Sequence, residues 1–202
     1  MLANTDTRKE EIINACMWLY DEYNFKDITI KLISEHTTFS RPSIYNYFET
    51  KEEIFLAIFQ KEYEEWKLEL DAIKDGYEKL NKDEFADLLA KTLAGKERLL
   101  KLLSMNMYDL EENSRIERLT EFKKAYGSAV EAVFALYQKF FPDKNERESY
   151  EFAYTFFPFV FGVYPYAILT NKQKEAMEKA NISYPHLSIY ELAYMGIKKI
   201  LG

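Results

Sequence analysis

A short segment near the N-terminus carries closely spaced signals for helix starts, and it constrains the fold more than any other part of the sequence. Thr29 precedes an apolar stretch and is a good N-cap. Ser40 is a second one, with a hydroxyl able to accept from an amide one turn in. Pro42 follows in the first turn, where its missing N–H costs nothing. The pattern predicts two short helices, at about residues 30–36 and 40–48.

A longer helix is predicted on each side of this pair. Upstream, one apolar face at helical spacing covers residues 8–24 and consists of Ile12, Cys16, Leu19 and Tyr23. Downstream, Thr50 and Glu53 form a capping box for a helix over residues 51–74. A longer helix followed by two short ones that are joined by a tight turn is the layout of helix-turn-helix domains, which read DNA.

The chain resembles the TetR family of bacterial one-component repressors over residues 29–51, most densely in the runs Ser40-Arg41-Pro42-Ser43-Ile44-Tyr45-Asn46-Tyr47-Phe48 and Thr50-Lys51-Glu52-Glu53. The rest of the chain agrees with the family in length and helical pattern. One departure is the turn, where the family usually has a small residue and then Gly, and this chain has Thr37-Thr38. Because β-branched residues are strained at positive φ, we expect the Thr38 backbone to avoid that region.

The resemblance implies a set of DNA-contacting residues: Thr29, Lys31, Ser40, Arg41, Pro42, Ser43, Tyr45, Tyr47 and Lys51. Arg41 and Ser43 would face base edges, and Arg41 suits the O6 and N7 atoms of guanine. The phenols and lysines of the set would contact phosphates. The alternative is that Tyr45 belongs to the core and Arg41 is merely solvated. Ile44 and Phe48 are expected in the core.

Net charge argues against a DNA-binding protein at first sight, because it is −7. Residues 1–50 hold five Lys or Arg against eight Asp or Glu, a balance of −3. Local placement decides binding, however, and four basic residues fall at helix starts or turns of the predicted domain: Lys26, Lys31, Arg41 and Lys51. We therefore expect weak non-specific binding, and specific binding that weakens with salt.

Composition favours a packed helical protein of the cytoplasm. The 202 residues are 48% hydrophobic with six Gly and five Pro, which excludes disorder. The single cysteine, Cys16, is expected to be buried and fits a reducing compartment. Residues 1–6 lack the features of a secretory signal. Residues 152–169 are uncharged but contain Pro158 and Pro165, and we interpret them as a buried interface helix, kinked at a proline, that does not span a membrane.

The predicted fold class is all-α, with about nine helices and no strand. Beyond the helix over 51–74, helices are predicted over residues 82–94, 96–108, 114–141, 144–169, 172–180 and 187–201. Asn81 and Glu84 form a further capping box. Residues 1–50 would form the three-helix DNA-binding domain. Residues 51–202 would form the ligand-binding and dimerisation domain, which the helix over 51–74 joins to the first.

The last helix is apolar along two stripes, so it must be covered on two sides. The resemblance implies that it pairs, together with the helix over 144–169, with the same helices of a second copy. The predicted dimer interface comprises Phe161, Pro165, Tyr190, Ala193, Tyr194, Gly196, Ile197 and Ile200. The alternative is that both helices are buried within one chain.

A regulator of this family implies a small-molecule pocket in the C-terminal domain. Large adaptable side chains could line it: Met105, Tyr108, Phe122, Tyr126, Phe152, Phe156, Phe159 and Tyr164. Aromatic residues at helical spacing are also ordinary core. His36 and His186 stand apart from any cysteine or histidine cluster, so no metal and no cofactor is expected.

The leading interpretation is a homodimeric repressor that binds a palindromic double-stranded operator and is released by a small hydrophobic effector. The alternative is a DNA-binding regulator whose C-terminal domain recognises a protein partner. An enzyme is not expected, because the sequence has no catalytic carboxylate pair, nucleophile elbow, phosphate loop or metal spacing.

Overall fold

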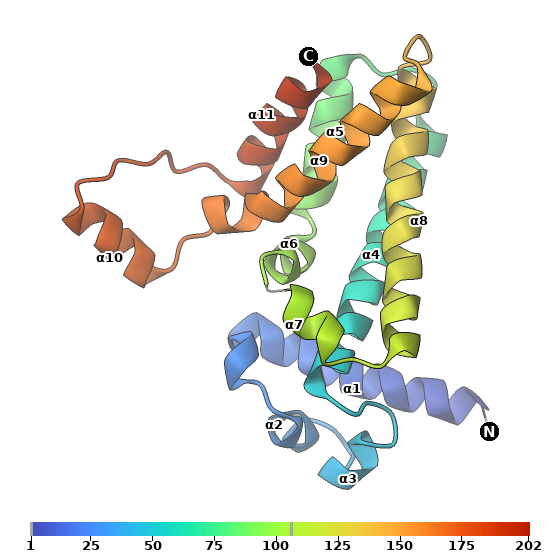
Figure 1. Cartoon of the computed structure of the whole chain (residues 1–202), viewed down its shortest axis with the longest axis vertical. Helices are drawn as coiled ribbons and strands as arrows, with labels where there is room; N and C mark the ends of the chain where they lie inside the picture. Colours follow the sequence, from blue (N-terminus) through green and yellow to red (C-terminus); the bar gives the residue numbers. More distant parts are fainter. Residues whose placement is uncertain (1, 106) are drawn as a thin grey trace. The chain divides into compact units, whose positions relative to one another are not determined.

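The computed structural model describes residues 2–105 and 107–202, with side chains from residue 7 onward. Residue 106, within the predicted helix over 96–108, and Met1 lie outside the described residues. The helices of the described residues (Figure 1) are α1 (Leu2–Glu22), the 3-10 helix η1 (Phe25–Asp27), α2 (Ile30–Glu35), α3 (Arg41–Ile44), α4 (Lys51–Gly76), α5 (Lys82–Ala94), α6 (Glu97–Leu103), α7 (Met107–Glu112), α8 (Ile116–Phe140), α9 (Glu146–Ala167), α10 (Asn171–Lys179) and α11 (Ile189–Leu201). None of these ranges is a strand, which confirms the all-α fold class.

The chain forms two compact units. Unit 1 consists of residues 1–63 and 106–126, and unit 2 consists of residues 64–105 and 127–202. Unit 1 therefore contains the predicted DNA-reading helices together with α7 and the beginning of α8.

The core of unit 1 forms where the apolar pattern of the sequence places it. Ile12, Cys16 and Leu19 of α1 are fully buried, as predicted for one helix face. Phe55 of α4 lies 5.1 Å from the ring of Tyr20, in an edge-to-face contact. Burial raises the pKa of the Cys16 thiol far above its ordinary value, so this cysteine is an inert core residue.

The predicted capping hydrogen bonds are present at the starts of α2 and α5 and absent at the start of α3. The Thr29 hydroxyl accepts from the Leu32 N–H at 3.1 Å, as predicted. The capping box of Asn81 and Glu84 at the start of α5 is also present. Ser40 is the residue before α3, but its hydroxyl makes no capping bond.

Helix boundaries differ from the predictions in two places. The helix α3 is shorter than predicted, because regular helix ends at Ile44 and a turn follows. The predicted helix over 96–108 is two helices, α6 and α7, with Ser104 and Met105 outside both. Ser104 closes α6 by donating its hydroxyl to the Lys101 carbonyl, a local bond that ends the helix where apolar periodicity alone continues it.

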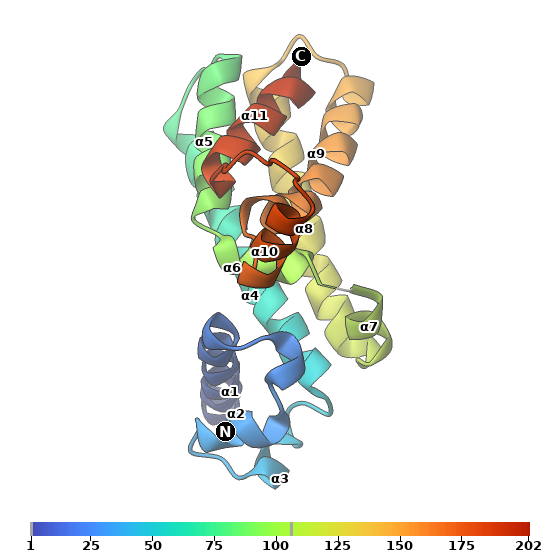
Figure 2. The ribbon, with the colours of Figure 1, turned by 90° about the vertical axis from the view of Figure 1, so that its left-hand side faces the viewer.

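In unit 2, α11 packs against both α5 and α9 (Figures 1 and 2). Its buried residues follow one another at intervals of four and are Ile189, Ala193, Ile197 and Leu201. A stack of aromatic side chains continues the core across α9, where the Phe152 ring lies 4.4 Å from Tyr137 and 5.7 Å from Phe156. One face of α11 is therefore buried within the single chain, as the alternative to a dimer interface predicted.

Helix α9 continues through both Pro158 and Pro165. Each proline removes one internal hydrogen bond of the helix, and both prolines are exposed. Among the described residues no single helix is long and apolar enough to cross a membrane, although the bent pair α9 and α10 passes that test together.

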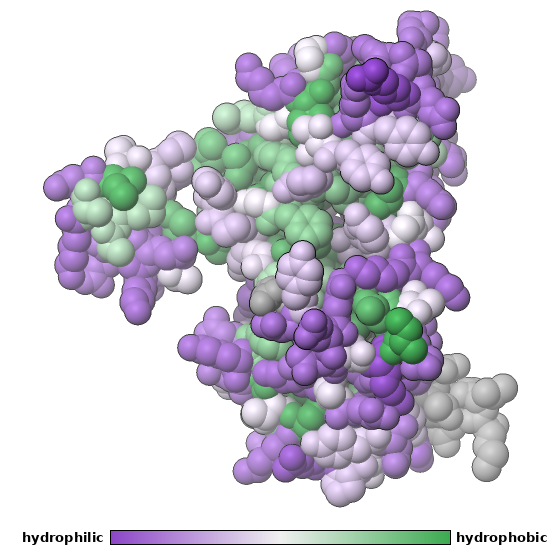
Figure 3. Space-filling view, in the orientation of Figure 1, coloured by the Kyte–Doolittle hydropathy of each residue, from purple (hydrophilic) through white to green (hydrophobic). Residues whose placement is uncertain are grey.

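Helix α10 has no buried residue and lies on an arm away from the rest of unit 2 (Figure 3). Ile182, which follows α10, is 53% exposed.

Candidate nucleic-acid interface

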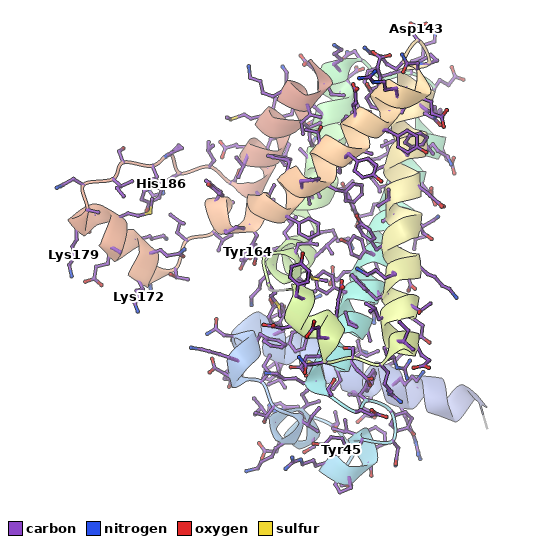
Figure 4. All side chains as sticks on the ribbon, viewed as in Figure 1. Tyr45, Asp143, Tyr164, Lys172, Lys179 and His186 are labelled. Atoms are coloured by element: carbon purple, nitrogen blue, oxygen red, sulfur yellow. The ribbon has the colours of Figure 1, made fainter. Side chains whose placement is uncertain are left out.

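Helix α3 and the turn after it present polar and aromatic side chains to solvent on a buried apolar anchor. The anchor consists of Ile44 and Phe48, which are 0% and 1% exposed, so the prediction that both belong to the core is confirmed. Arg41 and Pro42 are exposed, as is Tyr45, which Figure 4 labels beside α3. The buried anchor holds the backbone of the segment in place, and the exposed side chains remain available to a partner.

Arg41 and Tyr45 are one helical turn apart and orient each other. The Arg41 Nη2 donates to the Tyr45 hydroxyl at 3.2 Å. The guanidinium also lies over the Tyr45 ring, 5.8 Å from its centre. A planar guanidinium held in this way retains N–H groups for a guanine or a phosphate, and less of its conformational entropy is lost on binding.

Ser40 and Ser43 lie beside this pair. Their hydroxyl groups are 2.9 Å apart and hydrogen-bond to each other, which replaces the predicted side-chain cap. The Ser43 N–H bonds to the Ser40 carbonyl at 2.9 Å, so the backbone begins the helix without the cap. The hydroxyl pair offers donor and acceptor groups close to Arg41.

The turn between α2 and α3 is held by a residue that sequence reasoning missed. The Thr38 N–H donates to a carboxylate oxygen of Glu11, in α1, at 2.6 Å. Asn181 is the only non-glycine residue with positive φ along the described chain, so Thr38 has an ordinary backbone conformation, as expected. The chain thus builds its turn without glycine and ties it to α1. In the sequence Glu11 looks like any other glutamate of a helix, so nothing there indicated this long-range bond.

The remaining predicted DNA contacts have partners inside unit 1. The Lys51 Nζ donates to the carbonyls of Phe25 at 2.9 Å and Ile28 at 3.1 Å, so at most one of its three donors remains for a phosphate. The Thr29 hydroxyl oxygen caps α2. The Lys31 side chain is 74% exposed, with only a loose ion pair to Glu35 at 3.8 Å.

Tyr47 lies half-buried beside the turn, and its ring is 6.5 Å from that of Phe39. Its carbonyl accepts from Arg118, in the first turn of α8, and from Arg115, which lies just before that helix. No sequence pattern connects either arginine with DNA reading. Arg115 also binds Glu53, which is 0% exposed. The Glu53 carboxylate accepts from the Glu49 N–H at 2.8 Å, and this contact replaces the return half of the predicted capping box.

Predicted pocket residues are divided between the two units. In unit 1, Phe122 is buried and packs against Phe59, whereas Tyr108 is 80% exposed. Tyr126 makes an edge-to-face contact with Tyr63 in the same unit. The members in unit 2 are Met105, Phe152, Phe156, Phe159 and Tyr164.

The unit 2 members differ in burial. Phe152 and Phe156 belong to the aromatic stack of the core. Met105, Phe159 and Tyr164 are half-buried, and Figure 4 labels Tyr164 near the end of α9. Burial raises the pKa of Tyr164, and the nearby Glu97 carboxylate raises it further. Among the unit 2 members of the predicted set, these three side chains are the ones that retain exposed surface.

Predicted dimer-interface residues fall into two groups. Ala193 and Ile197 are 0% exposed within the single chain, so their side chains have no surface left for a second copy to cover. Those that retain surface are Phe161, Pro165, Tyr190, Tyr194, Gly196 and Ile200. Gly196 lies directly against the ring of Phe159, and a Cβ at this position would overlap the ring. At this glycine α11 is therefore approached closely by α9 of the same chain.

Among the side chains of residues 7–105 and 107–202, no three or more metal-ligating groups form a cluster.

Comparison with known proteins identifies relatives for both parts of the chain. Residues 12–58 match the family described as bacterial regulatory proteins, tetR family, and residues 60–193 match the family described as tetracyclin repressor-like, C-terminal domain. Similar solved structures include the fatty acid degradation regulator FadR of Bacillus halodurans, with a TM-score of 0.63 and 14% identity over 96% of this chain and 95% of that one. A TetR-family transcriptional regulator of Mesorhizobium loti has a TM-score of 0.59 and 15% identity over 97% and 96% of the two chains. Identities this low show a shared fold. No curated protein matches the sequence.

Proposed function

Because the chain belongs to the TetR family and is a DNA-binding transcriptional regulator, we propose that it is a ligand-released repressor that reads its operator with residues 41–47. The family fold points to a non-enzymatic transcription factor. We assign DNA reading to residues 1–50, and ligand sensing and dimerisation to residues 51–202. As a bacterial regulator of this kind it would act on the chromosome, in the cytoplasm.

One observation carries the DNA-reading proposal. Arg41 and Tyr45 are exposed on a short helix whose opposite side is anchored by the buried Ile44. A side chain that donates two parallel N–H groups from a rigid helix is suited to the O6 and N7 atoms of guanine in the major groove. Two acidic residues of α1 have partners within the chain: Glu10 pairs with Lys61 at 2.9 Å, and Glu11 binds the Thr38 N–H.

We propose that the functional form is a homodimer that uses the outward sides of α9 and α11. Support comes from apolar side chains that the single chain leaves at the surface, among them Phe161 and Met195, the latter 52% exposed. Two copies related by a twofold axis present two reading segments, so the operator is palindromic. Light scattering that reports a monomer at micromolar concentration contradicts this part of the proposal.

The first expected result concerns the operator. Selection from a random duplex library returns an enriched palindromic or pseudo-palindromic site. On that site Arg41→Ala weakens binding by about 1–3 kcal/mol and relaxes the preference at one base pair of each half-site. Fluorescence anisotropy with the selected duplex, and with the same duplex altered at each position in turn, measures both effects.

The matched control is Arg147→Ala, because the Arg147 side chain is 87% exposed and its partner, Glu151, is one turn away in α9. It removes the same charge from unit 2 and leaves the half-site preference unchanged. A library that yields no enriched half-site with the wild-type protein rules out sequence-specific reading by this surface.

We propose further that the effector is a mostly apolar molecule with an aromatic or lipophilic body. The proposal is supported by three half-buried side chains of the predicted set in unit 2, Met105, Phe159 and Tyr164, which are suited to adaptable apolar contact and supply one phenol. An effector can release DNA only by the difference between its affinities for the DNA-competent and the released states. A coupling of about 1–3 kcal/mol is ordinary for such a system.

The expected result is that uncharged lipophilic compounds raise the melting temperature and lower operator affinity. Each compound that stabilises the protein is titrated against the protein–operator complex. Tyr164→Phe serves as a matched variant, because it removes the phenol hydroxyl and keeps the ring. Compounds that stabilise the protein and leave operator affinity unchanged contradict ligand release, and the DNA-reading proposal then stands without it.

A further inference from the structure

The end of the reading segment is held from outside the helix-turn-helix. The Tyr47 carbonyl accepts from Arg118 Nη2 at 3.2 Å and from Arg115 Nη2 at 3.4 Å. Tyr47 lies in the turn that follows α3. Two guanidinium groups from outside this turn supply hydrogen bonds to its carbonyl.

Arg118 also covers the apolar anchor of the segment. Its guanidinium lies 5.4 Å from the centre of the Phe48 ring, and Phe48 is 1% exposed. The Tyr47 and Phe48 N–H groups both bond to the Ile44 carbonyl, at 2.9 and 3.0 Å. Arg118 therefore contacts the same turn through the backbone and through the ring.

Arg115 is itself fixed by a buried carboxylate. Its Nε and Nη2 donate to the two Glu53 oxygens at 2.6 and 2.7 Å, in a bidentate pair. Burial alone raises the pKa of Glu53, but the hydrogen bonds from Arg115 and Glu49 and the Arg115 charge outweigh it, and the net pKa is lowered. The bond to Glu53 raises the pKa of Arg115. Thr50 adds a bond to the Asn113 carbonyl at 2.8 Å.

These contacts join two segments that are distant in the sequence. Residues 113–118 lie in the part of the chain that matches the C-terminal family domain, yet they belong to unit 1 together with residues 47–53. The Arg118 side chain is 18% exposed and pairs with Glu121 at 2.7 Å. Its donors are thus directed at Tyr47 and Glu121, and it is poorly placed to bind a phosphate.

We propose that Arg118, supported by Arg115, is a positioning residue for operator recognition: it fixes the end of the reading segment and makes operator affinity depend on the conformation of residues 113–118. The proposal rests on DNA reading by residues 41–47. Because α8 begins at Ile116, a change at the start of this helix reaches the Tyr47 carbonyl through one side chain. The C-terminal domain therefore has a direct connection to the reading segment.

The test is Arg118→Met, which keeps an unbranched apolar stem and removes the guanidinium with its donors and charge. We expect a roughly tenfold loss of affinity for the selected operator, the size of one misplaced base contact. Affinity for an unrelated duplex stays the same. The slope of log Kd against log salt, measured from about 50 to 200 mM, is also unchanged, because no phosphate contact is lost. Hydrogen exchange of the Tyr47 and Phe48 amides becomes faster, whereas that of α11 does not.

The control is Arg147→Met, which removes an equally basic side chain in unit 2 and leaves all four measurements unchanged. A salt slope reduced by about 0.9, with equal loss on both duplexes, shows a phosphate contact and overturns the positioning role. Unchanged operator affinity with faster exchange overturns it as well.

Arg118→Lys provides the second variant if Arg118→Met does not fold. Its single ammonium cannot bridge Tyr47 and Glu121 as a guanidinium does, so we expect an intermediate loss of operator affinity. If wild-type protein selects no operator, the proposed function fails; if it does and Arg118→Met matches it, only this inference fails.

Discussion

Arg115→Met is expected to lower the free energy of unfolding by about 3 kcal/mol at pH 7, within the range found when one partner of a buried ion pair is removed. The cause is Glu53, which is 0% exposed and loses its bidentate partner. The value is placed at the low end of that range, because the Arg115 side chain is 41% exposed and part of its interaction is screened by water. Urea denaturation monitored by circular dichroism measures the change.

The same variant carries a pH signature with a definite sign. In the wild type the Glu53 pKa is lowered, so its stabilising contribution is present above the unfolded value of about 4.3 and is lost as the pH falls through the lower folded value. In Arg115→Met, burial and the backbone hydrogen bonds to Glu53 remain, but the side-chain bond and the charge of Arg115 are gone, so the pKa of Glu53 is higher than in the wild type. The difference in stability between the two proteins should therefore be largest near neutral pH and shrink below about pH 4.

The control is again Arg147→Met, whose ion pair with Glu151 is solvent-exposed on both sides, and which should show no measurable change at either pH. Two results would contradict the assignment of Glu53 as a buried carboxylate held by Arg115. One is that Arg115→Met is as stable as the wild type at pH 7; the other is that the difference in stability between the two proteins grows on acidification.

Gly196→Leu is expected to cost about 3 kcal/mol, the upper end of the usual range for overpacking a core. A side chain at this position overlaps the Phe159 ring, which occupies the space that glycine leaves. Either the ring must leave its position or α11 must move away from α9. Thermal and urea unfolding of the two proteins measure the loss.

Two controls separate this clash from the general effect of changing a helical glycine. A Cβ on Gly162, in α9, meets nothing within 4 Å. Gly162→Ala should therefore stabilise the protein, by about 0.5–1 kcal/mol, because alanine is the better helix former. Combining Gly196→Leu with Phe159→Ala should recover part of the lost stability. Equal losses in the single and double variants indicate that Phe159 is not the obstacle. Because Gly196 contacts its own chain, its substitution tests the fold of unit 2 before it tests a dimer.

The sequence by itself determined the elements that depend on neighbours three or four positions away. The cap at Thr29, the capping box at the start of α5 and the burial of Ile44 and Phe48 follow from local rules, and the structure confirms each of them. The exposed set around Arg41 was recognisable because its members lie within one short stretch of chain that resembles the TetR family.

Tertiary structure alone decided which charged side chains hold this segment in place. Glu11 reaches Thr38 across 27 positions, and Arg115 reaches Glu53 across 62, so no periodicity or capping pattern connects them. The same is true of α11, where the sequence left open which apolar side chains are buried, and packing against α5 and α9 selected Ile189, Ala193, Ile197 and Leu201. Hydrophobic pattern and capping act through the local backbone, whereas ion pairs and helix packing depend on which distant surfaces the fold brings together.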